Sequence, residues 1–226
     1  MTAVIVIICL LGIAADILFI KSEYDEDMKK AVWLKGLASA FFVILGVYCF
    51  AKNPSSAGKL IVIGLALGMI GDVLLNLRYL VSKSASNKVF ALGILAFLSG
   101  HILYIIALFG RGANPLTALI LTAVISVLGI PPLMKRITAP SKGLKIFGYV
   151  YLVIVIAMFS AAASLLIGNG ASPFNILFAV GALFFMVSDF IMIYYSFGKK
   201  IPPLRAINLS TYYAGQLLIA ICVLLA

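Results

Sequence analysis

The sequence predicts an all-α membrane protein with eight transmembrane helices, and three observations lead to this fold class. Of the 226 residues, 64% are hydrophobic and 11% are charged, whereas soluble domains are about 45–50% apolar and about 25% charged. The apolar residues form runs of about 20, which is the length that crosses a bilayer as a helix. The runs are continuously apolar rather than alternating, which argues against a β-barrel.

The eight spans are separated by turn and charge signals. The first run lacks a basic leader and a clear cleavage site, so we expect a retained helix rather than a signal peptide. No linker is long enough to divide the chain, so residues 1–226 are predicted to form a single membrane domain. The predicted spans are 2–20, 31–51, 59–79, 88–110, 115–135, 145–168, 173–196 and 205–225.

The distribution of Lys and Arg predicts the orientation. The loops after the first, third, fifth and seventh spans hold 13 of the 17 basic residues, and the other three loops hold 3. The remaining one, Lys35, lies inside the second span. Basic loops stay in the cytoplasm, so both termini are predicted to be outside, most simply across a bacterial cytoplasmic membrane. The same pattern explains the net charge of +10 without any nucleic-acid partner.

Two pairs of segments indicate an internal repeat. IGLALGMIGDVLL (63–75) aligns without gaps on VGALFFMVSDFIM (180–192), and LSGHILYI (98–105) resembles YAGQLLIA (213–220). The first pair places Asp72 on Asp189, and the second places His101 on Gln216. Halves of about 1–110 and 115–226 would then be parallel four-helix repeats.

Polar residues inside the spans are the candidate functional residues, because a charge at mid-bilayer costs about 2.5–3.5 kcal/mol. Asp72 and Asp189 each lie about seven residues from a cytoplasmic end, or about 10 Å deep, and are expected to line a common cavity. The ionisable set is Asp16, Lys35, Asp72, His101 and Asp189. The neutral polar set is Asn76, Tyr104, Tyr149, Tyr151, Ser188, Tyr213 and Gln216.

Structural interpretations of these residues stay open at this point. Asp16 and Lys35 each lie about four residues from a cytoplasmic end, where they could neutralise each other, or Lys35 could extend its amine to the interface. His101 could serve only as an interhelical hydrogen-bonding residue. A metal bound by two aspartates and His101 is a weaker alternative, because the chain has one histidine and no HxxxH or HExxH spacing.

Several of these positions carry a family resemblance. The chain resembles the YhhN-like lysoplasmalogenases, a family of eight-span membrane proteins. The family often has proline after the lysine of the second span, and Gly36 stands there in this chain. The matching pieces are Lys35, GDVLL (71–75), FLSGHILYIIALF (97–109), GALFFMVSDFIMIYYSF (181–197) and YYAGQLLIA (212–220).

The resemblance implies hydrolysis of the vinyl ether bond of a lysoplasmalogen. The products would be a fatty aldehyde and glycerophosphoethanolamine or glycerophosphocholine. An enol ether is first protonated on carbon, which gives an oxocarbenium ion, and water then adds to that ion. The reaction needs an acid that holds its proton near neutral pH and a carboxylate beside the cation, as in glycosidases. A metal, a cofactor or a serine nucleophile is not required.

We expect Asp72 and Asp189 to be the acid/base pair, without deciding which is the acid. His101 and Tyr104 would orient water or one carboxyl group. Lys35 would bind the phosphate of a lysophospholipid that enters from the bilayer. The remaining substrate-binding candidates are Asn76, Ser188, Tyr213 and Gln216.

Two other classes of function compete with the enzyme. Parallel repeats and buried carboxylates also fit a proton-coupled transporter of small solutes. A lipid-binding or assembly factor without turnover would use the same apolar walls. Solute uptake driven by a pH gradient would favour the transporter, aldehyde release would favour the enzyme, and unchanged co-purified lipid would favour the binding protein.

Overall fold

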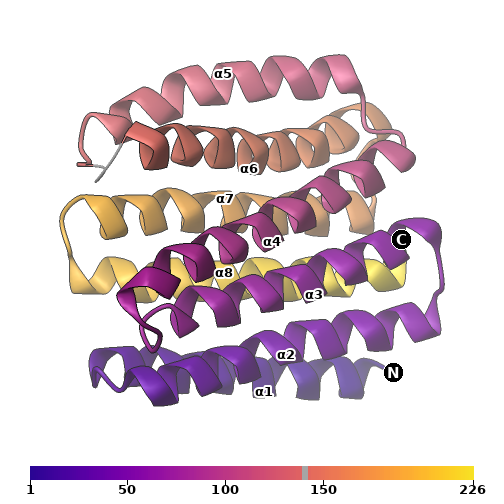
Figure 1. The fold of residues 1–226 in the computed structure, drawn as a ribbon. Helices are drawn as coiled ribbons and strands as arrows, with labels where there is room; N and C mark the ends of the chain where they lie inside the picture. The colour runs from indigo at the N-terminus through magenta and orange to yellow at the C-terminus, as the bar shows by residue number, and fades with distance from the viewer. Residues whose placement is uncertain (139–141) are drawn as a thin grey trace. The chain divides into compact units, whose positions relative to one another are not determined.

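The computed structural model describes residues 1–138 and 142–226 (Figure 1). This part of the chain contains eight α-helices, one short 3₁₀ helix and no strand. Every α-helix is long and apolar enough to cross a bilayer, which confirms the predicted all-α, multi-pass membrane protein. The helices are α1 (Thr2–Tyr24), α2 (Met28–Lys52), α3 (Ser56–Leu77), α4 (Lys83–Gly110), α5 (Pro115–Met134), α6 (Lys142–Asn169), α7 (Pro173–Phe197), α8 (Pro202–Cys222) and η1 (Val223–Leu225).

Side-chain caps set several helix starts. In each case an Asp, Ser or Asn oxygen accepts a hydrogen bond from the backbone N–H three residues later, which satisfies a group that the helix itself leaves open. The caps let helices begin before their apolar runs, as α2 and α3 both do. The capping residues are Asp27, Ser55, Asn114 and Ser172.

The turn between α1 and α2 is shorter than predicted. It spans only residues 25–27, with Glu26 at a φ of 56°. Asp16 therefore lies eight residues before the end of α1, and Lys35 lies seven residues after the start of α2. The predicted distance of four residues was wrong for both, because each helix gains about one turn of polar sequence.

Asp72 and Asp189 also differ in their distance from the helix ends. Asp72 lies five residues before Leu77 and Asp189 lies eight residues before Phe197. The difference of three residues corresponds to about 4.5 Å along a helix. The two carboxyl groups therefore do not lie at equal distances from their helix ends. Their equal depth in the membrane stays a prediction.

The connection between α5 and α6 is described only in part. Pro131 and Pro132 lie in the last turn of α5, inside the helix rather than in the loop. The predicted break KRITAPSKGLK includes residues 139–141, which lie outside the described residues.

The helices form two compact units, each described by itself. Unit 1 comprises residues 1–104 and 219–226, and unit 2 comprises residues 105–218. In unit 1, the glycines of α3 let α4 approach closely. A Cβ on Gly64 would overlap the Tyr104 ring, and one on Gly71 would lie 2.6 Å from the Phe97 ring. Small residues allow this kind of backbone approach between membrane helices.

Matching glycine contacts occur in both units. A Cβ on Gly100 would lie 3.0 Å from the carbonyl oxygen of Gly64, and one on Gly215 would lie 2.8 Å from that of Gly181. The predicted repeat aligns Gly64 with Gly181 and Gly100 with Gly215. The duplication stays a prediction, and these contacts are in keeping with it.

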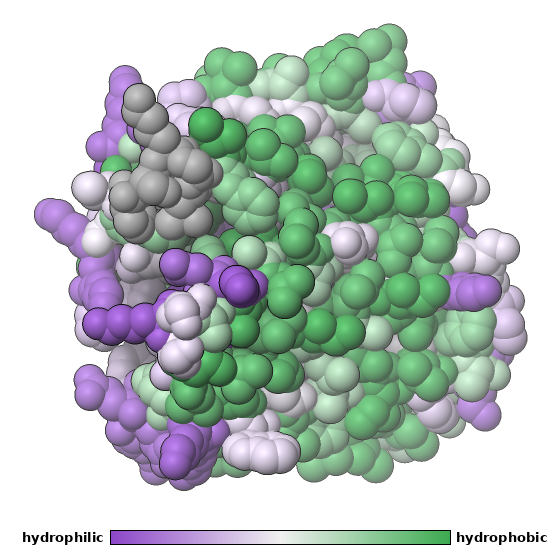
Figure 2. Space-filling model, viewed as in Figure 1, coloured by the Kyte–Doolittle hydropathy of each residue, from purple (hydrophilic) through white to green (hydrophobic). Residues whose placement is uncertain are grey.

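Hydrophobic side chains cover much of the face drawn in Figure 2. Large apolar residues lie exposed along the helices, among them Val127 and Leu128 on α5 at about 70% exposure (71% and 70%). A soluble protein seldom exposes so much contiguous apolar surface. Lipid chains are the environment that suits it.

Candidate functional site

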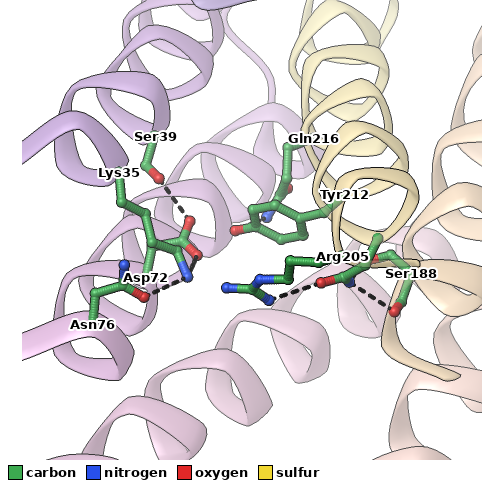
Figure 3. Close-up of polar contacts among 9 residues, drawn as sticks. Lys35, Ser39, Asp72, Asn76, Ser188, Arg205, Tyr212 and Gln216 are labelled. Atoms are coloured by element: carbon green, nitrogen blue, oxygen red, sulfur yellow. Dashed lines mark hydrogen bonds and ion pairs between the residues drawn. The ribbon is translucent and has the colours of Figure 1, made fainter. Parts of the chain in front are cut away.

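A buried polar cluster joins α2 to α3 within unit 1 (Figure 3). Lys35 Nζ lies 3.2 Å from Asp72 Oδ1 and donates a hydrogen bond of 3.3 Å to Asn76 Oδ1. Ser39 Oγ donates to Asp72 Oδ2 at 2.6 Å. Lys35 and Ser39 are four residues apart on one helix, as are Asp72 and Asn76 on the other, so each pair lies on one helix face. Two such faces meet in this cluster.

Burial strengthens the electrostatic attraction between the charged groups of this cluster. Lys35 and Asp72 are 5% and 2% exposed, so water screens their attraction little. The Lys35 ammonium also lies 5.6 Å from the centre of the Phe19 ring, which attracts a cation. Lys35 therefore points into unit 1, and the interpretation that its amine extends to the interface was wrong.

Asp16 adds a second carboxyl group to this region of unit 1. It is buried and interacts electrostatically with both Asp72 and Lys35. Asp16 Oδ1 has no hydrogen-bond partner in the described part of the chain. The ion pair that Lys35 forms there is with Asp72, so helix packing selects Asp72 over the predicted neutralising partner, Asp16.

His101 and Tyr104 lie together on α4, also in unit 1. Both are 1% exposed. Their rings stack at a centroid distance of 6.3 Å and an interplanar angle of 19°. The structure thus brings together the two residues expected to orient water, and their role in orientation stays a prediction.

In unit 2, Asp189 has a tyrosine partner. Tyr151 on α6 donates its hydroxyl to Asp189 Oδ2 at 2.7 Å, and both residues are buried. The sequence marked Tyr151 only as a polar residue within a span. The contact shows that α6 supplies a hydroxyl donor to a carboxylate on α7, much as α2 does for α3 through Ser39.

A second polar chain in unit 2 runs from α7 to α8. Asn208 Nδ2 donates to the backbone oxygen and to the hydroxyl of Ser188, each at 2.8 Å. Arg205 Nη1 donates to Asn208 Oδ1 at 3.0 Å (Figure 3). Sequence reasoning missed Asn208 and counted Arg205 only as a loop charge. The signal was present, since both fall inside the last predicted span.

Aromatic rings surround the predicted residues Tyr213 and Gln216. Gln216 Nε2 donates to the hydroxyl of Tyr212 at 3.3 Å. The Tyr212 ring meets Tyr213 edge-on at 4.9 Å and Phe185 at 5.2 Å. Tyr212 thus links Gln216 and Tyr213, and sequence reasoning had not selected it.

No group of three or more His, Cys, Asp or Glu side chains able to hold a metal ion occurs within residues 1–138 and 142–226. The predicted alternative of a metal bound by two aspartates and His101 therefore has no candidate ligand set in the described residues.

The chain was compared with known proteins. No solved structure matched it. The model of the YhhN family matches residues 30–223. The match includes every predicted site residue from Lys35 to Gln216, which agrees with the resemblance noted from the motifs. The chain belongs to the YhhN family.

Proposed function

We propose that this protein is a membrane-embedded hydrolase that cleaves the vinyl ether bond of lysoplasmalogens. The observation that carries the proposal is the buried Asp72, held by Lys35 and Ser39. A second buried carboxyl group, Asp189, is held by Tyr151. Buried, hydrogen-bonded carboxyl groups inside membrane helices are costly and usually mark function, and family membership supports a hydrolase.

Two carboxyl groups match the needs of this reaction. Carbon protonation of the enol ether requires a proton donor, and the oxocarbenium ion that results is stabilised by an ionised carboxylate. The proposal assigns these roles to Asp72 and Asp189. His101 and Tyr104 would orient the attacking water.

The substrate would be a lysophospholipid taken directly from the bilayer. Its single hydrocarbon chain suits the apolar helices, and its phosphate requires a basic partner. Lys35 was predicted for that role, but its ammonium lies against Asp72 and Asn76. In this proposal the Lys35 ammonium therefore binds the Asp72 carboxylate in preference to the lipid phosphate. Asn76, Ser188, Tyr213 and Gln216 remain the proposed contacts for glycerol or water.

The proposal also includes a location and an orientation. The basic loops would lie in the cytoplasm of a bacterium and both termini on the other side of its cytoplasmic membrane. The support is the count of 13 basic residues against 3 in the two sets of loops.

Aldehyde release from lysoplasmenylethanolamine by the purified protein in detergent tests the proposal. A coupled dehydrogenase assay reports the aldehyde. We expect activity in the wild type and none in Asp72→Asn or Asp189→Asn. Asp25→Asn is the matched control, because Asp25 is exposed in the turn after α1. Full activity in either buried variant would overturn the roles assigned here. Solute uptake driven by a pH gradient, with no aldehyde formed, would favour a transporter.

A further inference from the structure

We propose that Asp16 recognises a lysolipid substrate by accepting a hydrogen bond from the free hydroxyl group of its glycerol. The inference rests on the proposed function for the identity of the lipid. It goes further because it assigns the selection of lysolipids over two-chain lipids to a residue outside the proposed acid/base pair. The observation that carries it is a buried carboxyl oxygen, Asp16 Oδ1, which has no hydrogen-bond partner in the described part of the chain.

The side chain of Asp16 faces the polar cluster of unit 1. Asp16 lies on the buried face of α1, and Phe19 lies on the same face one turn further along. The Phe19 ring lies 5.6 Å from the Lys35 ammonium. Asp16 itself interacts electrostatically with Lys35 and Asp72. Its carboxyl group is therefore directed toward these two residues and not toward lipid.

The short turn between α1 and α2 sets Asp16 level with Lys35. Asp16 lies eight residues before the end of α1, and Lys35 lies seven residues after the start of α2. These spacings correspond to about 12 Å and about 10.5 Å along the two helices. Because α1 packs against α2 and α2 against α3, each of the three helices contributes one ionisable side chain to the same part of unit 1.

The hydrogen bonding of Asp16 leaves room for a ligand. Asp72 Oδ2 accepts a hydrogen bond from Ser39, whereas Asp16 Oδ1 accepts none from the described residues. Asp16 is 6% exposed, and a buried polar atom without a partner costs free energy, so native proteins contain few of them. A ligand that donates a hydrogen bond to Oδ1 recovers this cost.

A lysoplasmalogen carries a suitable donor near its vinyl ether. The carbon that bears its free hydroxyl is bonded to the carbon that bears the ether oxygen. A carboxyl group near Asp72, which is proposed to act on the vinyl ether, can therefore reach that hydroxyl in the same bound lipid. In a two-chain lipid the hydroxyl is esterified and its proton is lost. Asp16 Oδ1 would then stay unpaired, and a site built to bind a hydroxyl discriminates strongly against a ligand that lacks it.

Calorimetric binding in detergent tests the inference with a pair of lipids. One is a saturated ether lysophosphatidylethanolamine, which has no vinyl ether bond to cleave. The other is the same lipid with hydrogen in place of the glycerol hydroxyl. We expect the wild type to bind the first about 5- to 100-fold more tightly, as for one hydrogen bond to a carboxyl group. In Asp16→Ala the two values of Kd should become about equal.

The ratio of the two Kd values separates recognition from structural damage. A substitution that only disturbs packing weakens the binding of both lipids alike and leaves the ratio unchanged. Asp25→Ala is the matched control, because Asp25 is exposed in the turn after α1, and it should keep the wild-type ratio. Asp16→Leu repeats the test if the alanine variant does not yield folded protein. Equal binding of both lipids by the wild type would overturn the inference, as would a ratio that persists in a folded Asp16 variant.

Failure of this inference can be told apart from failure of the proposed function, because binding does not require turnover. If lysoplasmenylethanolamine releases no aldehyde but the ratio depends on Asp16, the hydrolase is wrong and recognition of the hydroxyl stands. If aldehyde is released and the ratio does not depend on Asp16, the hydrolase stands and the inference is wrong. Undetectable binding of both lipids to the wild type would also overturn the inference.

Discussion

The buried ion pair between Lys35 and Asp72 should be visible as a large coupling energy in the free energy of unfolding. The cycle uses Lys35→Met, Asp72→Asn and the double variant. Each single change leaves one charge buried without its partner, and the double change removes both charges. The two substitutions should therefore be far from additive.

The magnitude follows from the burial of both side chains. Removing one partner of a buried pair costs about 3–5 kcal/mol, and proton exchange at the remaining group lowers that cost. If each single variant loses about 3 kcal/mol, additivity predicts a loss of about 6 kcal/mol. A neutral pair in place of a buried ion pair is often nearly neutral in stability, so these losses give a coupling energy of about 6 kcal/mol. If proton exchange lowers each single loss to about 1 kcal/mol, the coupling energy is still about 2 kcal/mol.

Unfolding in mixed micelles with increasing SDS, followed by loss of helical structure, measures all four proteins. The matched control replaces Lys35→Met with Lys59→Met, an exposed lysine 13 residues before Asp72 on α3, or about 20 Å along the helix. That pair should be additive within about 0.5 kcal/mol. A coupling as small as this for Lys35 and Asp72 would refute the reasoning.

Three further predictions concern packing, positioning and orientation. Gly215→Ala should lower the stability by about 1–3 kcal/mol, because the added methyl group would meet backbone atoms. Gly168→Ala, with open space around it, should leave the stability unchanged or raise it by up to about 1 kcal/mol. Thermal unfolding in detergent compares the two variants, and equal behaviour would contradict the close contact at Gly215. Tyr151→Phe should lower kcat about tenfold, as expected for the loss of a hydrogen bond worth about 1.4 kcal/mol, while the yield of folded protein stays unchanged. An unaltered kcat would argue against a role for Tyr151 in positioning Asp189. In a background without native cysteines, Glu26→Cys should react with an impermeant maleimide only from the cytoplasmic side. Asn114→Cys should react only from the opposite side. The reverse pattern would overturn the predicted orientation in the membrane.

The membrane fold could be predicted from local sequence because each helix depends on its own residues. A run of about 20 apolar residues buries all of its backbone groups in intrahelical hydrogen bonds, whatever its neighbours do. Helix ends were less predictable, since caps such as Asp27 lengthened helices beyond their apolar runs. As a result, Asp16 and Lys35 lie about one turn farther from the helix ends than expected.

The candidate residues could be predicted for a similar reason. A charged side chain within an apolar span is costly on any arrangement of helices, so Lys35, Asp72 and Asp189 stand out without a structure. Asn208 and Ser39 did not stand out. Their importance comes from the group that they contact, and small polar residues also occur on membrane helices for packing alone.

What the sequence determined by itself was therefore the membrane class, the order of the helices and the short list of buried ionisable residues. The tertiary structure decided which side chains hold them. From the sequence, either Asp16 or Asp72 could form an ion pair with Lys35. The packing of α2 against α3 places Lys35 beside Asp72, and these two residues form the ion pair. The sequence also did not identify the contacts of the two aspartates, among which are the Lys35 ammonium and the Ser39 hydroxyl for Asp72 and the Tyr151 hydroxyl for Asp189. The physical reason is that contacts between helices depend on rotation and approach, which are settled by packing across the bundle and not by any single segment.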